Sequence, residues 1–259
     1  MNNKIAIIYT TFLRNELAFE TIQAIQSQLS ENCILLLGDQ NQSEQRINHN
    51  PNWHYTFYYS LPYDCGLSYA RNYLVQQVNV LNYKYCLITA DSIEFTQLYN
   101  FQPIIEFMES DSKIVKVGFQ LNNRIPWEYN LTLDKAFTLH ISNEWLLLDN
   151  INYHKVDMCK NFFLAKTEAL FEVPWDDDLK LGEHEDHCWR LKQAGYKTYH
   201  TNAISANYIK SDNPEYTAMR KRLYSEFIPK LCAKYNLQSW IHYDPDVIAE
   251  IRNQRKLCS

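Results

Sequence analysis

Apolar residues alternate along this chain between short continuous runs and longer stretches with helical spacing. Continuous runs occupy Lys4–Thr11 and Cys33–Asp39, and a third begins at Tyr85 and ends in acid at Asp91. Such runs predict strands that are buried on both faces, as in a parallel sheet. Between the first two runs, Glu16–Leu29 has the periodicity of a helix. This order predicts a βαβ opening whose ligand groups lie at the carboxyl ends of the strands.

Further helices and strands follow this opening. Leu98–Met108 has a helical pattern that Pro103 interrupts, and Ile114–Phe119 and Lys197–Ala206 predict strands. A helix is predicted to begin at Glu183 and to stop at a glycine near residue 195. We therefore expect an α/β fold of three layers, in which a mixed, mainly parallel sheet lies between helices.

The segment after residue 210 differs from the rest of the chain in pattern and charge. Apolar residues recur at helical spacing from Pro214 onward, so we expect one domain over residues 1–210 and a helical extension over residues 211–259 packed on it. Residues 210–259 hold nine Lys or Arg against six Asp or Glu, although the whole chain carries a net charge of −5. Two interpretations of this segment stay open, a solvated helical face or contact with an anionic membrane surface.

Acidic residues concentrate at the start of the helix predicted from Glu183. Three aspartates precede it, and Glu183, His184, Glu185 and Asp186 then follow one another. Acids at a helix N-terminus are partly stabilised by its amide groups and its dipole. This number exceeds what capping needs and concentrates like charge, which favours a binding or catalytic site.

Composition excludes several common classes of protein. Only 5 glycines stand beside 19 tyrosines, and neither a Walker loop nor Gly-x-Gly-x-x-Gly occurs, which excludes the common kinase and dinucleotide-binding classes. The seven cysteines are scattered without CxxC spacing, so a disulfide framework or structural zinc is not expected. The amino-terminal apolar run is too short for a signal peptide or a membrane span. We expect a cytoplasmic protein with no nucleic-acid partner.

The spacing from Glu183 to Arg190 resembles the Glu-Asp motif of inverting glycosyltransferases with the GT-A fold, particularly family 2 and the related galactosyl- and N-acetylgalactosaminyltransferases. In those enzymes a carboxylate at this helix start deprotonates the acceptor hydroxyl. The resemblance implies a catalytic group of His184, Glu185 and Asp186, with His184 at the usual position of the base. Asp186 and His184 both stay open as the base, because an ionised carboxylate and a neutral imidazole each accept a proton near neutral pH.

Gly66–Asn72 resembles a second segment of the same family, in which a glycine precedes a helix bearing Ala-Arg-Asn. Arg71 is then expected to project toward the donor and Asn72 toward the catalytic loop. The resemblance also implies that residues 1–95 bind a UDP-sugar and that residues 96–210 hold the acceptor and the catalytic group. The donor-binding residues that it implies are Thr11, Arg14, Asp39, Gly66, Arg71, Asn72 and Asp91.

Only one of the two aspartates of the family's Asp-x-Asp motif is present in this sequence. Thr89 replaces its first aspartate and Asp91 is its last, while the histidine ligand of many relatives falls near Asn207. The resemblance implies Mn²⁺ or Mg²⁺ on Asp91, with water, Glu94 or His200 as further ligands. The alternative is neutralisation of the diphosphate by cationic side chains, such as Arg71, Lys210 and Arg220.

The acceptor is expected opposite the donor, in contact with Trp127, Trp175 and Glu183. An aromatic ring can stack on a sugar face, although each tryptophan equally suits core packing. The acceptor class that the resemblance implies is a glycan or a lipid-linked glycan, which the basic carboxyl-terminal segment could meet at the inner face of a membrane.

The reaction implied is transfer, with inversion, of a hexose or N-acetylhexosamine from a UDP-sugar to an acceptor hydroxyl, as in surface polysaccharide or lipopolysaccharide synthesis. One alternative is a degenerate protein of this fold that binds nucleotide or glycan without catalysis, suggested by Thr89, His184 and Asn207. Another is a sugar-phosphate nucleotidylyltransferase, but the glycine-rich basic loop of that class is absent.

Overall fold

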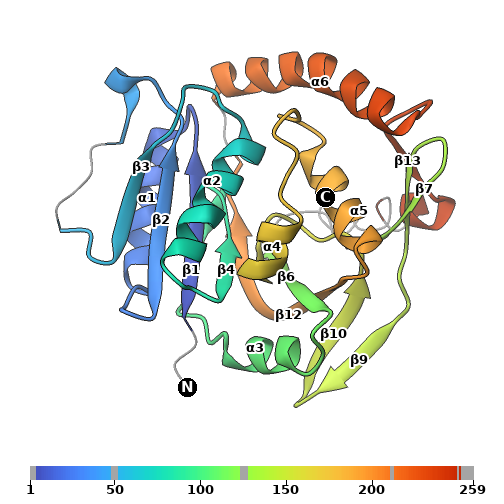
Figure 1. The fold of residues 1–259 in the computed structure, drawn as a ribbon, viewed down its shortest axis with the longest axis horizontal. Helices are drawn as coiled ribbons and strands as arrows, with labels where there is room; N and C mark the ends of the chain where they lie inside the picture. Colours follow the sequence, from blue (N-terminus) through green and yellow to red (C-terminus); the bar gives the residue numbers. More distant parts are fainter. Residues whose placement is uncertain (1–3, 48–51, 123–127, 211–212, 250, 252–259) are drawn as a thin grey trace.

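A ten-stranded mixed sheet forms the centre of the molecule (Figure 1). The structure is a computed structural model that describes residues 4–47, 52–122, 128–210, 213–249 and 251. The strands of the sheet are β1 (Ile5–Thr11), β2 (Cys33–Asp39), β3 (Thr56–Ser60), β4 (Tyr85–Ile88), β5 (Ile93–Glu94), β6 (Ile114–Asn122), β9 (Trp145–Leu148), β10 (Ile151–Val156), β11 (Phe163–Lys166) and β12 (Lys197–Tyr208). Their order is β3-β2-β1-β4-β11-β6-β12-β10-β9, and β5 pairs with β12.

Most strands of this sheet point the same way. β3, β2, β1 and β4 are mutually parallel. β11 runs antiparallel between β4 and β6, so β6 and its parallel neighbour β12 again point in the direction of β1. The carboxyl ends of β1, β2, β4 and β12 therefore gather at one edge, where open α/β sheets place their ligands.

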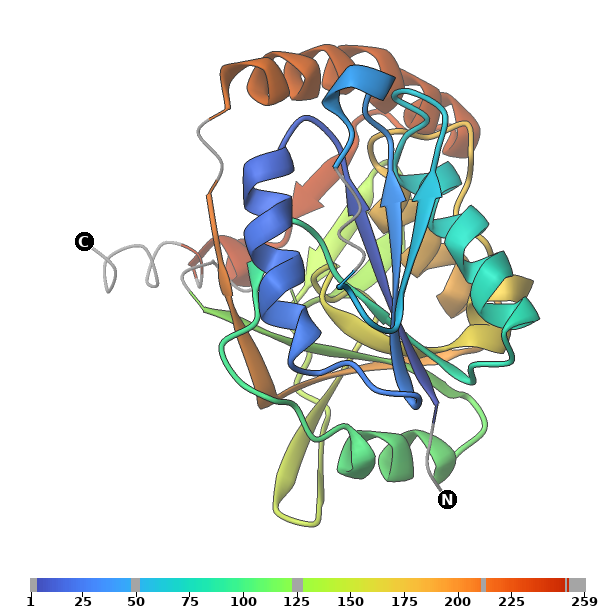
Figure 2. The same ribbon diagram turned by 90° about the vertical axis from the view of Figure 1, so that its left-hand side faces the viewer.

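Helices cover both faces of the sheet (Figures 1 and 2). They are α1 (Asn15–Gln26), α2 (Leu67–Val80), α3 (Gln102–Glu109), α4 (Thr167–Glu172), α5 (Glu183–Gln193) and α6 (Pro214–Tyr235), with a short 3-10 turn at Ser43–Gln45. α1 lies on one face and α2 on the other, while α6 lies across the carboxyl ends of the parallel strands (Figure 1). The predicted three-layer α/β fold with a mixed, mainly parallel sheet is confirmed.

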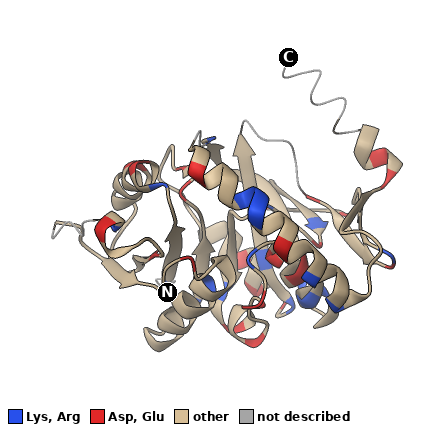
Figure 3. Cartoon of the chain, turned by 90° about the horizontal axis from the view of Figure 1, so that it is seen from above, with Lys and Arg blue, Asp and Glu red and all other residues tan. Residues whose placement is uncertain are grey.

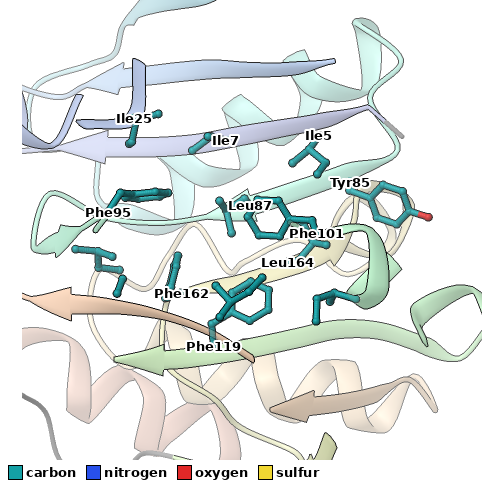
Figure 4. Packing of buried hydrophobic residues seen from close by; sticks show 14 of the residues in the cluster. Ile5, Ile7, Ile25, Tyr85, Leu87, Phe95, Phe101, Phe119, Phe162 and Leu164 are labelled. Carbon is teal, nitrogen blue, oxygen red and sulfur yellow. The ribbon is translucent and has the colours of Figure 1, made fainter. Parts of the chain in front are cut away.

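The core is divided by the sheet because successive side chains of a strand point to opposite faces. Ile5 and Ile7 of β1 belong to the cluster packed under α1 and α3, whereas Ala6 and Ile8 belong to the cluster under α2 and α4. Figure 4 shows part of the first cluster, in which aromatic rings such as Phe101, Phe119 and Phe162 lie among aliphatic side chains of the strands. Each fully buried large apolar side chain stabilises the fold by roughly 1.5–3 kcal/mol.

A second, three-stranded sheet was not predicted from the sequence. It consists of β7 (Asn130–Leu133), β8 (Phe137–His140) and β13 (Ile241–Tyr243) in the order β13-β8-β7. β13 pairs in parallel with β8, so the segment after residue 210 contributes a strand as well as α6. This pairing fixes the carboxyl-terminal segment against the middle of the chain.

One predicted helix differs in its bounds from the observed one. The pattern predicted Leu98–Met108 with an interruption at Pro103, but α3 begins at Gln102 and Pro103 lies in its first turn. Proline is tolerated there because the first amide groups of a helix have no intrahelical acceptor. Within the described ranges, every helix is too short or too polar to cross a lipid bilayer.

Candidate functional site

A pocket of about 590 Å³ lies between α6 and the carboxyl ends of the parallel strands. It is lined by the segments that follow β1 and β4, the starts of α2 and α5, and the first half of α6. Its charged lining residues are the cations Arg14, Arg71, Lys160, Lys180, Lys210 and Arg220 and the acids Asp64, Asp91, Glu183 and Glu185. The excess of cations over acids suits an anionic ligand.

Three of the predicted donor-binding residues meet at the end of β1. The Asp91 carboxylate forms an ion pair with Arg14 and accepts a hydrogen bond from Thr11 Oγ1 at 3.5 Å. Burial raises the pKa of Asp91 to about 6, although Arg14 opposes this shift. The Arg14 guanidinium also stacks on the ring of Tyr216, 3.9 Å from its centroid. Thr11, Arg14 and Asp91 therefore share one wall of the pocket.

Arg71 occupies the wall formed by α2. Gly66 precedes this helix with a φ of +88°, and a Cβ there would lie 2.7 Å from Lys180, so glycine suits the position on both counts. Arg71 is 1% exposed, its Nη1 lies 3.7 Å from Glu183 Oε1, and burial lowers its pKa. Its Nε and Nη1 have no hydrogen-bond acceptor in the described part of the chain. These buried donors are available to an acceptor on a ligand or a water in the pocket.

The pocket-facing end of α5 begins after Gly182, whose φ of +79° lies in the left-handed region. A Cβ on Gly182 would lie 2.6 Å from Leu231 of α6, so glycine permits the close approach of the two helices. Glu183, His184 and Glu185 then line the pocket.

Glu183 and Glu185 differ in their cation partners. Burial raises the pKa of both carboxyls, but Arg71 opposes the shift at Glu183. For Glu185, burial and the neighbouring charge of Glu183 raise the pKa to about 7. Among the residues that the structure describes, no Lys or Arg lies within ion-pair distance of Glu185. Glu185 can therefore exchange a proton near neutral pH.

His184 is oriented by the backbone. Its Nε2 lies 2.5 Å from the carbonyl oxygen of Cys159. A carbonyl only accepts, so Nε2 donates, and in the neutral ring Nδ1 then carries the lone pair. His184 keeps the position predicted for it beside the pocket.

Asp186 does not line the pocket. It is fully buried and accepts hydrogen bonds from Arg190 Nε at 2.8 Å, Lys234 Nζ at 2.5 Å and the Tyr235 hydroxyl at 2.8 Å. These contacts fasten α5 to α6 and occupy both carboxylate oxygens. Of the three residues predicted to form the catalytic group, the structure therefore brings His184 and Glu185 to the pocket and turns Asp186 away from it.

Two predicted donor-binding residues order loops beside the pocket instead of lining it. Asp39 accepts hydrogen bonds from the backbone amides of Asn41 at 2.9 Å and Ile47 at 2.8 Å. Asn72 donates to the Trp175 carbonyl at 2.8 Å and accepts from its amide at 2.9 Å, so it reaches the loop before α5, as the sequence predicts.

Of the two tryptophans predicted to contact the acceptor, the structure describes Trp175, which does not line the pocket. Trp175 is 2% exposed and stacks on His187 with ring centroids 4.1 Å apart, which is core packing. Trp127 lies outside the described residues. Trp240, which was not among the residues predicted to bind the acceptor, lines the pocket.

The predicted metal ligands do not lie together. His200 lies outside the pocket lining, 3.5 Å from Glu128 Oε1, and burial lowers its pKa to about 4. Glu94 Oε2 accepts a hydrogen bond from Asn207 Nδ2 at 3.0 Å. In the described ranges, no three His, Cys, Asp or Glu side chains form a group able to hold a metal ion. The structure thus leaves Asp91 without the second ligand expected from His200.

Several lining residues carry no local sequence signal. Lys160, Tyr216 and Trp240 are single residues in a loop, a helix and a connecting segment, and nothing in their neighbourhood marks a site. Lys180 could have been suspected from the sequence, because it lies two residues before Gly182 in the acid-rich segment that predicts a site.

Comparison with known proteins shows a shared fold. No family model and no curated protein matches this sequence. Among solved structures, S. aureus TarS 1–349 in complex with UDP is 13% identical with a TM-score of 0.57, covering 86% of this chain and 64% of that one. The same protein in complex with UDP-GlcNAc is 12% identical with a TM-score of 0.59, covering 83% and 61%.

A third structure, the mannosyltransferase PcManGT from Pyrobaculum calidifontis in complex with GDP-Man and Mn²⁺, is 12% identical with a TM-score of 0.58. The match covers 85% of this chain and 60% of that one. The chain thus spans less than two thirds of the length of these proteins. At such low identity, the likeness shows that the arrangement of helices and strands is shared.

Proposed function

We propose that this protein is an inverting glycosyltransferase that moves a hexose or N-acetylhexosamine from a UDP-sugar to a hydroxyl of a glycan acceptor. The observation that carries the proposal is that Arg14, Arg71, Glu183 and Glu185 line one shared pocket at the carboxyl ends of the strands. Three solved structures of the same fold hold UDP, UDP-GlcNAc or GDP-Man. A nucleotide sugar suits both kinds of lining residue. Its diphosphate suits the cations, and transfer of its sugar to a hydroxyl needs a base, which a carboxylate can supply.

Glu185 is proposed as the general base. The acceptor oxygen attacks C1 of the sugar while the bond from C1 to the diphosphate breaks, and Glu185 accepts the acceptor's proton. Asp186 is less suited to this role because two cations and a tyrosine hydroxyl already occupy its oxygens. General base catalysis supplies on the order of 10²–10⁴ in rate, and positioning of both substrates supplies much of the rest.

The acceptor is proposed to lie on the side of the pocket that Trp240 lines. Its indole Nε1 is buried and has no hydrogen-bond acceptor among the described residues. A tryptophan with an open donor suits a sugar, because the ring can stack on a sugar face while Nε1 donates to a hydroxyl. The acceptor class proposed is a glycan or lipid-linked glycan of a surface polysaccharide or lipopolysaccharide.

The proposed function is tested by incubating the purified protein with UDP-sugars and oligosaccharide acceptors and measuring UDP release. We expect release with at least one pair, and a product whose anomeric configuration is inverted when examined by NMR. Binding of UDP-sugars without release across the acceptor panel would support the alternative of a non-catalytic binding protein. Absence of binding to every nucleotide sugar would overturn the proposal.

A further inference from the structure

The carboxylate predicted to hold a metal ion is already paired with a guanidinium. Asp91 Oδ1 contacts Arg14 Nη2, its Oδ2 accepts from Thr11, and the residue is 1% exposed. In nucleotide sites Mg²⁺ is usually held by one or two carboxylates together with substrate phosphates and water, so the protein must supply at least one free carboxylate. Here the carboxylate predicted for that role is already paired with Arg14, and the described residues offer no group of three His, Cys, Asp or Glu side chains in its place. The surroundings of Asp91 therefore suit a guanidinium better than a divalent cation.

Arg14 is held in place from several sides. Tyr216, in the first turn of α6, stacks on its guanidinium at 3.9 Å, and Asp91 forms an ion pair with it. Asn213 Nδ2 donates to the Leu13 carbonyl at 2.6 Å, which ties the start of α6 to the residue before Arg14. The Arg14 Nε is buried and has no hydrogen-bond acceptor in the described ranges. The result is a fixed cation at the pocket with an unsatisfied donor.

Arg71 provides a second such cation. It is 1% exposed, lines the same pocket, and has two donors, Nε and Nη1, without a hydrogen-bond acceptor among the described residues. A guanidinium presents its donors in a planar fork that matches phosphate oxygens. Two guanidinium groups on one pocket, each with a buried donor nitrogen that has no hydrogen-bond acceptor among the described residues, thus match the chemistry of a diphosphate.

We propose that Arg14 and Arg71 take the place of a divalent metal, so that the nucleotide sugar binds and reacts without Mn²⁺ or Mg²⁺. This inference rests on the proposed function. In the transfer, the bond between C1 and the β-phosphate oxygen breaks and its electron pair stays on the diphosphate. The acceptor oxygen forms the new bond to C1 and loses its proton to Glu185. The guanidinium groups neutralise the charge that the diphosphate gains, and Asp91 is a positioning residue for Arg14.

Calorimetric titration of UDP into the purified full-length chain tests the inference, with GDP as a second probe and buffers that contain either EDTA or Mn²⁺. We expect the Kd for UDP to agree within about threefold between the two buffers. Tighter binding in Mn²⁺ by more than that overturns the inference and leaves the proposed function standing. Failure of both UDP and GDP to bind in either buffer overturns both.

Variants then test separately the binding of phosphate by Arg14 and the positioning of Arg14 by Asp91. Arg14→Gln should weaken UDP binding roughly tenfold to a hundredfold, because a charge-assisted hydrogen bond to phosphate is lost, and Arg14→Lys should recover part of the loss. Asp91→Asn should weaken UDP binding equally in EDTA and in Mn²⁺, whereas a loss confined to Mn²⁺ would identify Asp91 as a metal ligand. The matched control is Lys155→Gln, which removes an exposed ion pair with Glu144 outside the pocket.

Discussion

The three carboxylates in the first turn of α5 lie in three different surroundings. Glu183 lies beside Arg71, and Asp186 is held by Arg190 and Lys234. Glu185 lines the pocket with its pKa raised to about 7 by burial and by Glu183. Successive side chains on a helix point about 100° apart, so neighbouring acids need not share a face. The chemistry of the turn therefore differs residue by residue, and Glu185 is the carboxyl group suited to exchange a proton at the pocket.

The pH dependence of transfer should follow the ionisation of Glu185. Only the ionised carboxylate accepts a proton, so kcat/KM should rise with pH with an apparent pKa of about 7. Glu185→Gln should remove this rise and lower kcat/KM by on the order of 10²–10⁴ while UDP still binds. A pH–rate profile measured by UDP release checks this. If His184→Gln removes the rise and Glu185→Gln keeps it, the base is His184.

Glu185 should also affect stability, with a sign that can be checked without any substrate. Its folded-state pKa of about 7 lies above the ordinary value of 4.5, so the folded protein binds the proton more tightly. Stability is then lost as the pH rises from 4.5 to about 7. Since glutamine does not titrate, Glu185→Gln should be more stable than the wild type at about pH 8, by up to roughly 3 kcal/mol, and the difference should vanish near about pH 4. Urea unfolding at the two pH values measures it, and a difference that is constant with pH would contradict the raised pKa.

At the scale of elements, long periodic segments were predictable and short ones were not. The helix predicted over Glu16–Leu29 is observed as α1, Asn15–Gln26. It was predictable because its apolar stripe extends over several turns. β7, β8 and β13 have only three or four residues each, too few to distinguish a strand from a loop by period. The apolar residues of β9 do not indicate burial, since Trp145 and Leu147 are 61% and 66% exposed.

One capping residue fixes the start of α6. Asn213 Oδ1 accepts from the Tyr216 amide at 3.0 Å, and its Nδ2 donates to the Leu13 carbonyl. Asn213→Ala should lower the free energy of unfolding by about 1 kcal/mol. It should also weaken UDP binding, because Tyr216 stacks on Arg14. Urea unfolding and UDP titration measure the two effects.

The other end of α6 supplies the control for this variant. Asn236 ends the helix with a φ of +55°, a conformation that glycine adopts readily. Asn236→Gly should therefore change stability by no more than about 0.5 kcal/mol and leave UDP binding unchanged. Unchanged UDP affinity in Asn213→Ala would show that the start of α6 does not position Arg14.

At the scale of the whole molecule, the meeting of distant segments was partly predictable. Arg71 and Asp91 line one pocket because each lies after a strand whose carboxyl end is at the same sheet edge, and α5, which leads to the amino end of β12, begins at that edge with Glu183. The wall formed by α6 was not predictable in this way. Its apolar spacing indicates that one face packs on the domain, but the spacing does not say where, and the partners of Asp186 on α6 lie 48 and 49 residues away. Local patterns thus predict the strand-end residues and miss the helix that covers them.

The outer face of α6 is the surface most suited to an anionic membrane. Figure 3 looks onto this helix, on which five Lys or Arg stand against two Glu. Lys221, Arg222 and Lys230 are exposed, and Tyr224 beside them is 53% exposed. Each basic residue near an anionic surface contributes about 1 kcal/mol, and salt screens the attraction. Because α6 also covers the pocket, such contact would place the pocket close to a lipid-linked acceptor.

We therefore expect the protein to sediment with vesicles that contain phosphatidylglycerol, and not with vesicles of phosphatidylcholine alone. The triple variant Lys221→Gln, Arg222→Gln, Lys230→Gln should lose most of this binding, since it removes three of the basic residues of α6. The matched control is Lys84→Gln, Lys113→Gln, Lys155→Gln, which removes the same charge outside α6. Equal sedimentation of the two variants would mean that α6 is a solvated face, because net charge alone would then account for the binding.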